Sequence, residues 1–69
     1  MSENNLQIKT MTVKQLCNEL RQLGLSTSET KVRAAIKQGK YPFAINITMK
    51  NEEFEIYEKL FDKWVLERV

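Results

Sequence analysis

The 69-residue sequence contains no histidine, one cysteine, one proline and two glycines. With no imidazole and a single thiol, it lacks the ligands that transition metals prefer, so no metal site is expected. Cys17 has no partner for an internal disulfide, which favours a reducing compartment such as the cytoplasm. No stretch approaches the ~20 apolar residues that span a bilayer, and the amino terminus has no secretion signal. We therefore expect a cytoplasmic protein without a membrane partner.

Side chains for catalysis are equally scarce. Cys17 falls on the apolar face of an expected helix, and the chain offers no histidine to act as its base. The sequence predicts neither an enzyme nor a site for a cofactor or a small-molecule substrate.

Composition and charge describe one small domain with a polarised surface. The sequence is 42% hydrophobic and 29% charged, which is typical of a folded domain, and its length allows one core. We expect a domain over residues 11–69 after a flexible polar tail over residues 1–10. Residues 1–50 hold eight basic and three acidic side chains, whereas residues 51–69 hold three basic and six acidic ones. The basic part can attract a polyanion although the formal net charge is only +2.

Two short helices are predicted in the first half. Thr12 and Gln15 form a capping box that begins the first, and Gly24 supplies a left-handed cap that ends it. Its apolar stripe comprises Val13, Leu16, Cys17, Leu20 and Leu23. The second helix is expected over residues 27–38, with Ser26 or Ser28 as N-cap and Gly39 at its end. Its inward positions are Val32, Ala35 and Ile36. A connection of only residues 24–26 would pack the two helices at a steep angle, as in a helix-turn-helix.

The apolar period then changes to that of strands. Pro42 begins a strand whose alternate residues form an expected buried face: Phe43, Ile45, Ile47 and Met49. A turn at residues 50–51 and a strand over residues 53–56 complete a hairpin, with Phe54 and Ile56 on its buried side. A last helix follows from Tyr57. The predicted core is Leu16, Leu20, Val32, Ile36, Ile45, Ile47, Leu60, Phe61 and Trp64. The expected fold class is α+β, with a helix-turn-helix, a β-hairpin and a C-terminal packing helix.

The second helix has a polar face that is suited to nucleic acid. On a helical wheel this face carries Thr27, Thr30, Lys31, Arg33, Ala34, Lys37 and Gln38, and Lys40 follows it. Lysines suit phosphate, Arg33 suits guanine or phosphate, and small or polar residues allow close approach to base edges. A merely solvated face would look the same. The nucleic-acid interpretation requires Arg33 and Lys37 to be exposed and free of acidic neighbours.

Several segments resemble the small winged helix-turn-helix proteins of the excisionase type, relatives of the DNA-binding domain of mercury-resistance regulators. These segments are TVKQL, SETKVRAAIKQGKYPFA, the hairpin and EIYEKLFDKWV. The resemblance covers residues 11–68. It is most specific at residues 35–42, which look like the end of the recognition helix, its glycine and the proline entry to the wing.

The resemblance implies sequence-specific binding of double-stranded DNA, with the second helix in the major groove and the hairpin as a wing. Members of the family act in phages and mobile elements as architectural factors in site-specific excision, a form of DNA recombination, or as small transcription regulators. Self-assembly on DNA and contact with a recombinase are further implied. By position, the helix contacts would be Thr30, Lys31, Arg33, Ala34 and Lys37, and the wing contacts Asn46, Thr48, Lys50 and Asn51. The wing departs from the family, because Glu52 and Glu53 repel phosphate where arginines are common.

Two other functions remain open. The acidic residues 51–69 could face a basic protein, as in an adaptor, antirepressor or inhibitor. Binding of single-stranded nucleic acid would need exposed aromatic rings, and only Tyr41 is expected to be free, since Phe43 and Tyr57 fall on apolar stripes.

Overall fold

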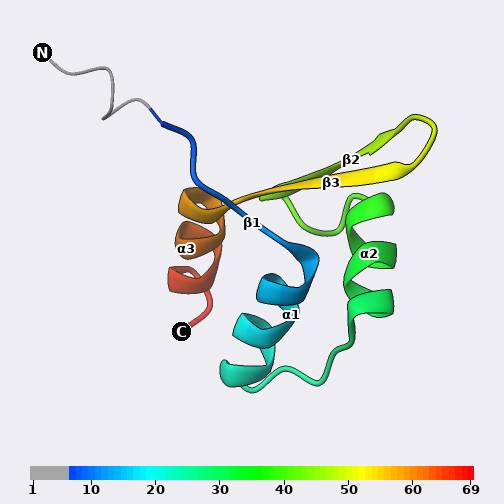
Figure 1. Ribbon diagram of the computed structural model, residues 1–69. Coiled ribbons are helices and arrows are strands. Elements are labelled where there is room, and N and C mark those ends of the chain that lie inside the picture. The colour runs from blue at the N-terminus through cyan, green and yellow to red at the C-terminus, as the bar shows by residue number, and fades with distance from the viewer. Residues whose placement is uncertain (1–6) are drawn as a thin grey trace, which may run out of the picture.

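A computed structural model describes residues 7–69 of the chain. These residues form three helices and a three-stranded antiparallel sheet, a small α+β fold that confirms the predicted class at this level. In chain order the elements are β1 (Thr10–Met11), α1 (Val13–Gln22), α2 (Glu29–Lys37), β2 (Ala44–Thr48), β3 (Glu52–Tyr57) and α3 (Glu58–Leu66). Figure 1 shows α3 and α2 on opposite sides of α1, with the β2–β3 hairpin projecting over α2.

Local signals set both ends of α1. The Thr12 hydroxyl accepts a hydrogen bond from the Gln15 backbone N–H at 3.0 Å, and the Gln15 side chain accepts one from the Thr12 N–H at 2.8 Å. Gly24 has φ +99°, and the Leu25 N–H donates to the Leu20 carbonyl at 3.0 Å, as in a Schellman cap. The predicted capping box and glycine cap are both confirmed.

Of the two N-caps that the sequence allowed for α2, the structure selects Ser28 rather than Ser26. The Ser28 side chain accepts a hydrogen bond from the Lys31 N–H at 3.2 Å, and α2 therefore begins at Glu29, later than predicted. Its end is as predicted, because Gly39 adopts φ +71° directly after the C-cap.

The connection between α1 and α2 runs over residues 23–28, so the predicted connection of residues 24–26 is too short. The Arg21 Nε atom donates to the Thr27 carbonyl at 2.9 Å and ties this loop to α1. Thr27 thus lies outside α2, and its predicted place on the polar face of that helix is wrong. Within residues 7–69 the covered Thr27 hydroxyl has no hydrogen-bond partner.

The sheet has the order β1-β3-β2, and its hairpin of β2 and β3 confirms that prediction. The short strand β1 was not predicted, because two residues show no alternation. Thr10 pairs with Tyr57, and the Glu58 N–H donates to the Lys9 carbonyl at 3.0 Å. The predicted boundary between a tail over residues 1–10 and the domain therefore falls inside a strand. The rest of the predicted tail, residues 1–6, lies outside the described residues.

The hairpin turn spans residues 49–51, one residue more than the predicted turn at residues 50–51. It pairs Asn46 with Phe54, whereas the shorter turn would pair Ile47 with Phe54. Because side chains alternate along a strand, this single residue turns the opposite face of β2 toward the helices. The predicted burial of Ile45, Ile47 and Met49 is consequently wrong, whereas Phe43, which precedes β2, is fully buried as predicted.

The observed core reflects this register. The buried hydrophobic residues among those described are Leu16, Cys17, Leu20, Val32, Ile36, Phe43, Ala44, Ile56 and Phe61. Two predicted core residues are wrong, since the Ile45 and Leu60 side chains are 46% and 47% exposed, and Ile47 and Trp64 are only half-buried. Ala44 faces the helices instead.

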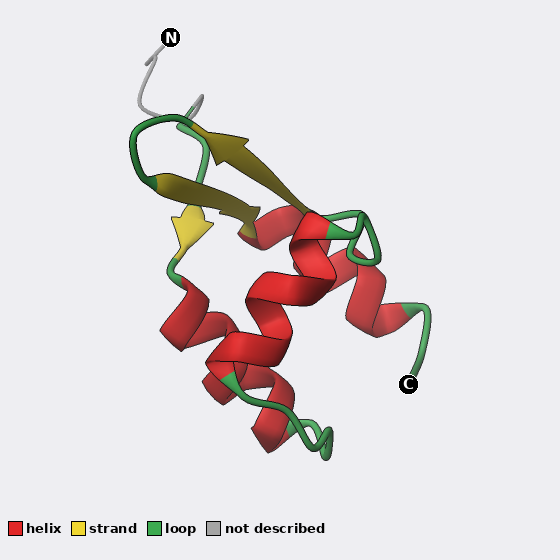
Figure 2. Cartoon of the chain, turned by 90° about the vertical axis from the view of Figure 1, so that its right-hand side faces the viewer, coloured by secondary structure: helices red, strands yellow, loops and turns green. Residues whose placement is uncertain are grey.

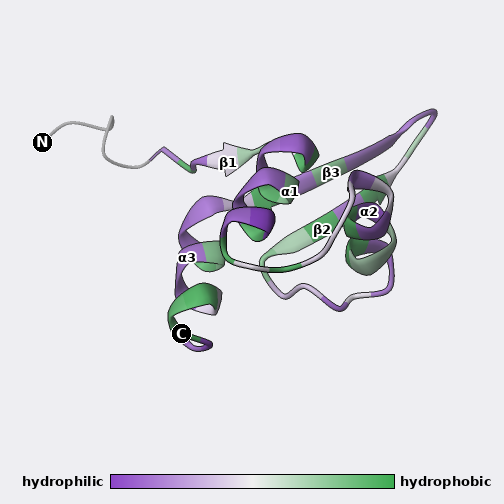
Figure 3. Ribbon diagram, turned by 90° about the horizontal axis from the view of Figure 1, so that it is seen from below, coloured by the Kyte–Doolittle hydropathy of each residue, from purple (hydrophilic) through white to green (hydrophobic). Residues whose placement is uncertain are grey.

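An aromatic cluster fixes α3 to the rest of the molecule. The Phe43 ring lies at its centre, with centroid distances of 5.0 Å to Tyr41, 5.1 Å to Phe61 and 5.2 Å to Trp64. Such contacts stabilise by about 0.5–1.5 kcal/mol per pair beyond the burial of their area. Figure 3 shows that the helices carry both hydrophobic and hydrophilic residues and that β2 is more hydrophobic than β3.

Candidate nucleic-acid interface

The face of α2 that points away from the core is polar. Val32 and Ile36 are buried and Ala35 is half-buried, which places the remaining residues of α2 toward solvent. The exposed side chains here are the predicted Thr30, Lys31, Arg33, Ala34, Lys37 and Gln38, and Lys40 follows them. Figure 2 shows α2 in front of the other helices, so this side of the molecule is open. The structure thus brings the predicted helix residues together on one surface, which we call the α2 face.

Two cations of the α2 face have acidic partners. The Arg33 guanidinium lies 3.2 Å from a Glu29 carboxylate oxygen one turn earlier. The Lys37 Nζ atom lies 2.7 Å from the Glu52 Oε2 atom at the start of β3. Both cations are exposed, as the nucleic-acid interpretation requires, but each has an acidic neighbour, so the second requirement of that interpretation is not met. Binding of a phosphate by either residue has to displace a carboxylate.

Both ion pairs remain open to water. The side chains of Lys37 and Glu52 are 48% and 42% exposed, and those of Arg33 and Glu29 are similarly accessible. Solvent-exposed pairs contribute only about 0.2–1 kcal/mol, so a ligand phosphate can compete for either cation. Lys31 makes no ion pair within residues 7–69, and its Nζ atom donates to the Ser26 carbonyl at 3.2 Å.

The hairpin residues of the candidate site divide into two groups. Asn46 and Thr48 lie on the sheet face that carries Ala44, and they are hydrogen-bonded to each other at 3.2 Å. The half-buried Asn46 also donates to the Glu53 carbonyl at 3.3 Å, which leaves its amide little freedom to bind a ligand. The second group, Lys50 and Asn51, is exposed in the turn.

The aromatic side chains do not form a surface for stacking bases. Tyr41, predicted to be free, is half-buried and stacks on Phe43. Burial raises the pKa of the Tyr41 phenol above its ordinary value, and the nearby Cys17 adds to the shift. Tyr57 occupies the N-cap position of α3 without a side-chain capping bond, and its hydroxyl donates to a Glu55 carboxylate oxygen at 2.7 Å. Tyr57, predicted to lie in the core, is only half-buried, and Tyr41 is not the free ring that was predicted. With Tyr41 stacked on Phe43, the single-strand interpretation loses the one ring on which it depended.

Sequence reasoning missed both acidic partners of the α2 face. The partner of Arg33 could have been found, because Glu29 lies four residues earlier on the same helix. The contact between Glu52 and Lys37 could not. Glu52 was recognised as repelling phosphate, but no local pattern shows that the hairpin carries it to the end of α2. Only the pairing of Thr48 with Glu52, together with the packing of α2 against β2, brings the two side chains together.

Other kinds of site find no support in the described part of the chain. Residues 7–69 hold no group of three or more histidine, cysteine, aspartate or glutamate side chains placed to bind a metal ion. Nor does any helix in this range have the length and apolar character to cross a membrane.

Comparison with models of protein families, with curated proteins and with solved structures gives no match for this chain. The functional interpretation therefore depends on the residues and geometry described above.

Proposed function

We propose that this protein is a winged helix-turn-helix protein of the excisionase type and that it binds double-stranded DNA through α2. In this proposal α1 supports α2, the β2–β3 hairpin is the wing, and α3 closes the core. The observation that carries the proposal is the α2 face itself, which is exposed, basic and without a large apolar side chain. A face of this kind can enter a major groove, where phosphates and base edges are polar.

The residues of the α2 face suit two kinds of DNA contact: contacts to phosphates, which position the helix on the duplex, and contacts to base edges, which recognise the sequence. Lys31 and Lys37 suit phosphate oxygens, which set the register of the helix on the duplex. Arg33 can bind guanine or phosphate with its planar fork, and Gln38 can pair with adenine. Ala34 lies among these residues, and its small side chain lets the helix approach the base edges closely.

Ion pairing moderates this affinity but does not abolish it. For DNA to bind through all its cations, Arg33 must leave Glu29 and Lys37 must leave Glu52. Each exchange costs about 0.2–1 kcal/mol, which is less than the gain expected from a charge-assisted bond to phosphate.

The wing is expected to lie on the sugar–phosphate backbone at most. Lys50 is the one basic residue of the turn, and Glu52 and Glu53 follow it directly. Two carboxylates this close to the tip oppose insertion into the minor groove, where the negative potential is strongest. Affinity then comes mainly from α2.

The salt dependence of duplex binding tests the proposal. Five cations are available for phosphate: Lys31, Arg33, Lys37, Lys40 and Lys50. If all of them displace counterions, the logarithm of the association constant should fall against the logarithm of salt concentration with a slope of about −4.5. If the two ion pairs stay closed, three cations remain and the slope should be about −2.7.

Variants locate the binding surface. Lys31→Gln and Lys37→Gln should each reduce the slope by about 0.9, whereas Lys63→Gln on α3 should leave it unchanged. Absence of duplex binding at low salt and micromolar protein contradicts the proposal, as does an equal effect of the Lys63 control.

The biological role within this proposal is that of an architectural excision factor or a small transcription regulator of a phage or mobile element. Sequencing DNA selected from a random pool separates the two roles. Repeated adjacent sites indicate assembly of several copies, with a recombinase as a further partner, whereas a single palindrome indicates a dimeric repressor.

A further inference from the structure

The sheet has a second face that no helix of residues 7–69 covers. Ala44 and Ile56 pair across β2 and β3 and are buried toward the helices. Because side chains alternate along strands, the opposite face carries the intervening residues: Ile45 and Ile47 of β2, and Glu53, Glu55 and Tyr57 of β3. The hydrogen bond from the Tyr57 hydroxyl to Glu55 confirms that these two side chains share one face. We call this set the outer face.

The outer face sets apolar side chains beside acidic ones. Ile45 lies opposite Glu55 and Ile47 lies opposite Glu53, so a row of isoleucines runs along a row of carboxylates. In Figure 3 the ribbon of β2 as a whole is more hydrophobic than that of β3. Neither carboxylate has an ion-pair partner within residues 7–69.

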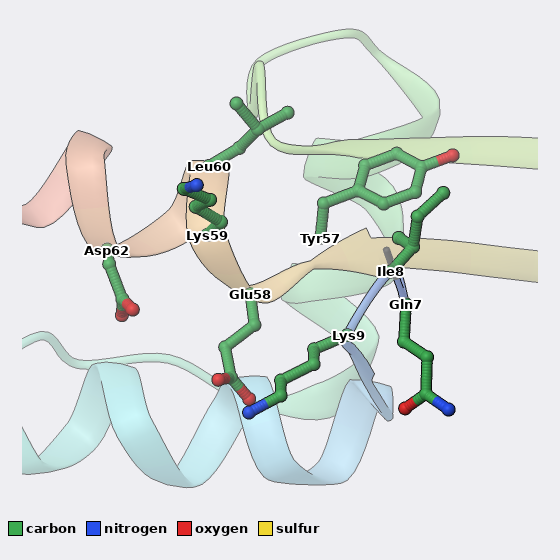
Figure 4. Close-up of a pocket in the computed structure, with 8 residues that line it drawn as sticks. All are labelled: Gln7, Ile8, Lys9, Tyr57, Glu58, Lys59, Leu60 and Asp62. Carbon is green, nitrogen blue, oxygen red and sulfur yellow. The ribbon is translucent and has the colours of Figure 1, made fainter. Parts of the chain in front are cut away.

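A pocket continues this surface at the β1 end of the sheet. It has a volume of about 520 Å³. Its apolar wall is made by Ile8, Tyr57 and Leu60, and its charged lining is balanced, with two lysines, Lys9 and Lys59, and two acids, Glu58 and Asp62. Figure 4 shows the Tyr57 ring beside Ile8, with Leu60 projecting from the first turn of α3. Ile8 is 77% exposed, so a large apolar side chain is accessible to a ligand here. The pocket and the outer face share Tyr57 and form one continuous surface.

We propose that the outer face and its pocket bind a segment of a partner protein that carries alternating apolar and basic side chains. Its basic residues would pair with Glu53 and Glu55, while its apolar residues would cover Ile45 and Ile47 and enter the pocket. Extended segments with alternating side chains match the period of a sheet surface. Charge complementarity favours a basic segment, and the apolar contacts supply the affinity.

The same observations exclude other occupants. Nucleic acid and anionic lipid are repelled by the two carboxylates. Two copies that meet through their outer faces would bring glutamate against glutamate. The basic α2 face of another copy offers no large apolar side chain for the pocket.

This surface is separate from the proposed DNA-binding surface. α2 packs on the side of β2 that carries Ala44, whereas the outer face is the reverse side of the sheet. DNA and a partner protein can therefore be bound together, and the inference does not depend on the proposed function.

The test uses the full chain and two synthetic probes. One is a capped peptide of alternating lysine and valine, and the other has glutamate in place of lysine. Titration of isotope-labelled protein should shift the backbone NMR signals of residues 45–47, 53–57 and 60 with the lysine peptide and not with the glutamate peptide. Ile45→Thr, or Glu53→Gln with Glu55→Gln, should raise the dissociation constant at least about fivefold.

A matched control lies at the other end of the molecule. Leu66→Gln with Glu67→Gln removes one exposed apolar and one acidic side chain from α3 and should leave the dissociation constant unchanged. The proposal is overturned if the lysine peptide shifts none of these signals, if both peptides bind alike, or if the control weakens binding equally. Signals of Ile45, Glu55 and Tyr57, which lie away from the hairpin turn, also overturn it if they move on dilution of the protein alone or on addition of duplex DNA, because another occupant then takes the surface.

Discussion

Replacing Glu52 with glutamine should increase the affinity of the protein for duplex DNA. The Glu52 Oε2 atom lies 2.7 Å from the Lys37 Nζ atom and therefore competes with any phosphate oxygen for this cation. In the proposed complex, DNA must displace this carboxylate before Lys37 can bind the sugar–phosphate backbone. In the Glu52→Gln variant Lys37 is already free, and a negative charge near the duplex is removed.

The size of the effect follows from the exposure of the pair. Both side chains are nearly half exposed, so the pair stabilises the free protein by about 0.2–1 kcal/mol. In the variant this energy is no longer lost when DNA binds, so the association constant should rise about 1.4- to fivefold. The slope of the salt dependence should become steeper by up to about 0.9, because one more cation releases counterions. The free energy of unfolding should fall by no more than about 1 kcal/mol.

Fluorescence anisotropy gives both the association constant and the slope of its salt dependence. The labelled duplex is one taken from the random-pool selection, and binding is measured over a range of salt concentrations. Glu67→Gln is the matched control, since its carboxylate lies 4.0 Å from the Arg68 guanidinium at the far end of α3. This variant has the same net charge as Glu52→Gln but leaves Lys37 paired. Unchanged or weaker binding by Glu52→Gln refutes the reasoning. An equal gain in both variants shows that net charge, not release of Lys37, is responsible.

Three further predictions concern stability. Phe43→Leu should lower the free energy of unfolding in urea by about 2 kcal/mol, because three ring contacts are lost from a fully buried site; a change below about 0.5 kcal/mol contradicts the central place of this ring. Gly39→Ala should lower the melting temperature by about 4–8 °C, since φ +71° is strained for alanine by about 1 kcal/mol although nothing obstructs its Cβ atom. Burial raises the pKa of Tyr41 in the folded protein, so the contribution of this group to the free energy of unfolding is complete below pH 10 and is lost as the pH rises through the folded-state pKa. The free energy of unfolding measured from about pH 9 upward should therefore fall less steeply in Tyr41→Phe than in the unchanged protein. Identical pH profiles for the two proteins would contradict that assignment.

Much of the helical structure could be predicted because its signals are local. The capping box at Thr12, the glycines at positions 24 and 39 and the spacing of apolar residues each involve groups within one or two turns of each other. The α2 face follows from the same spacing, since burial of Val32 and Ile36 decides which side of the helix meets water. Ser26 and Ser28 show the limit of such signals, because both satisfy a cap pattern and only the path of the loop selects one.

The hairpin shows what alternation alone leaves undetermined. Ile45 and Ile47 are more hydrophobic than Ala44 and Asn46, so the pattern favours isoleucines facing the helices. The turn over residues 49–51 reverses this choice, because one additional residue changes which positions of β2 lie opposite Phe54 and Ile56. Phe43 then fills the core from just outside the strand, and small Ala44 lets the helices approach.

The pairing of Lys37 with Glu52 was likewise beyond the reach of local patterns, whereas the pairing of Arg33 with Glu29 follows the i,i+4 spacing of a helix. Residues 37 and 52 are far apart along the chain, and their side chains meet only because the hairpin lies over the end of α2 (Figure 1). Short-range capping and periodicity were therefore enough to place the basic residues on one exposed helix face. The length of one turn and the packing of the hairpin on α2 determine which acid meets Lys37 and which isoleucines remain in contact with water.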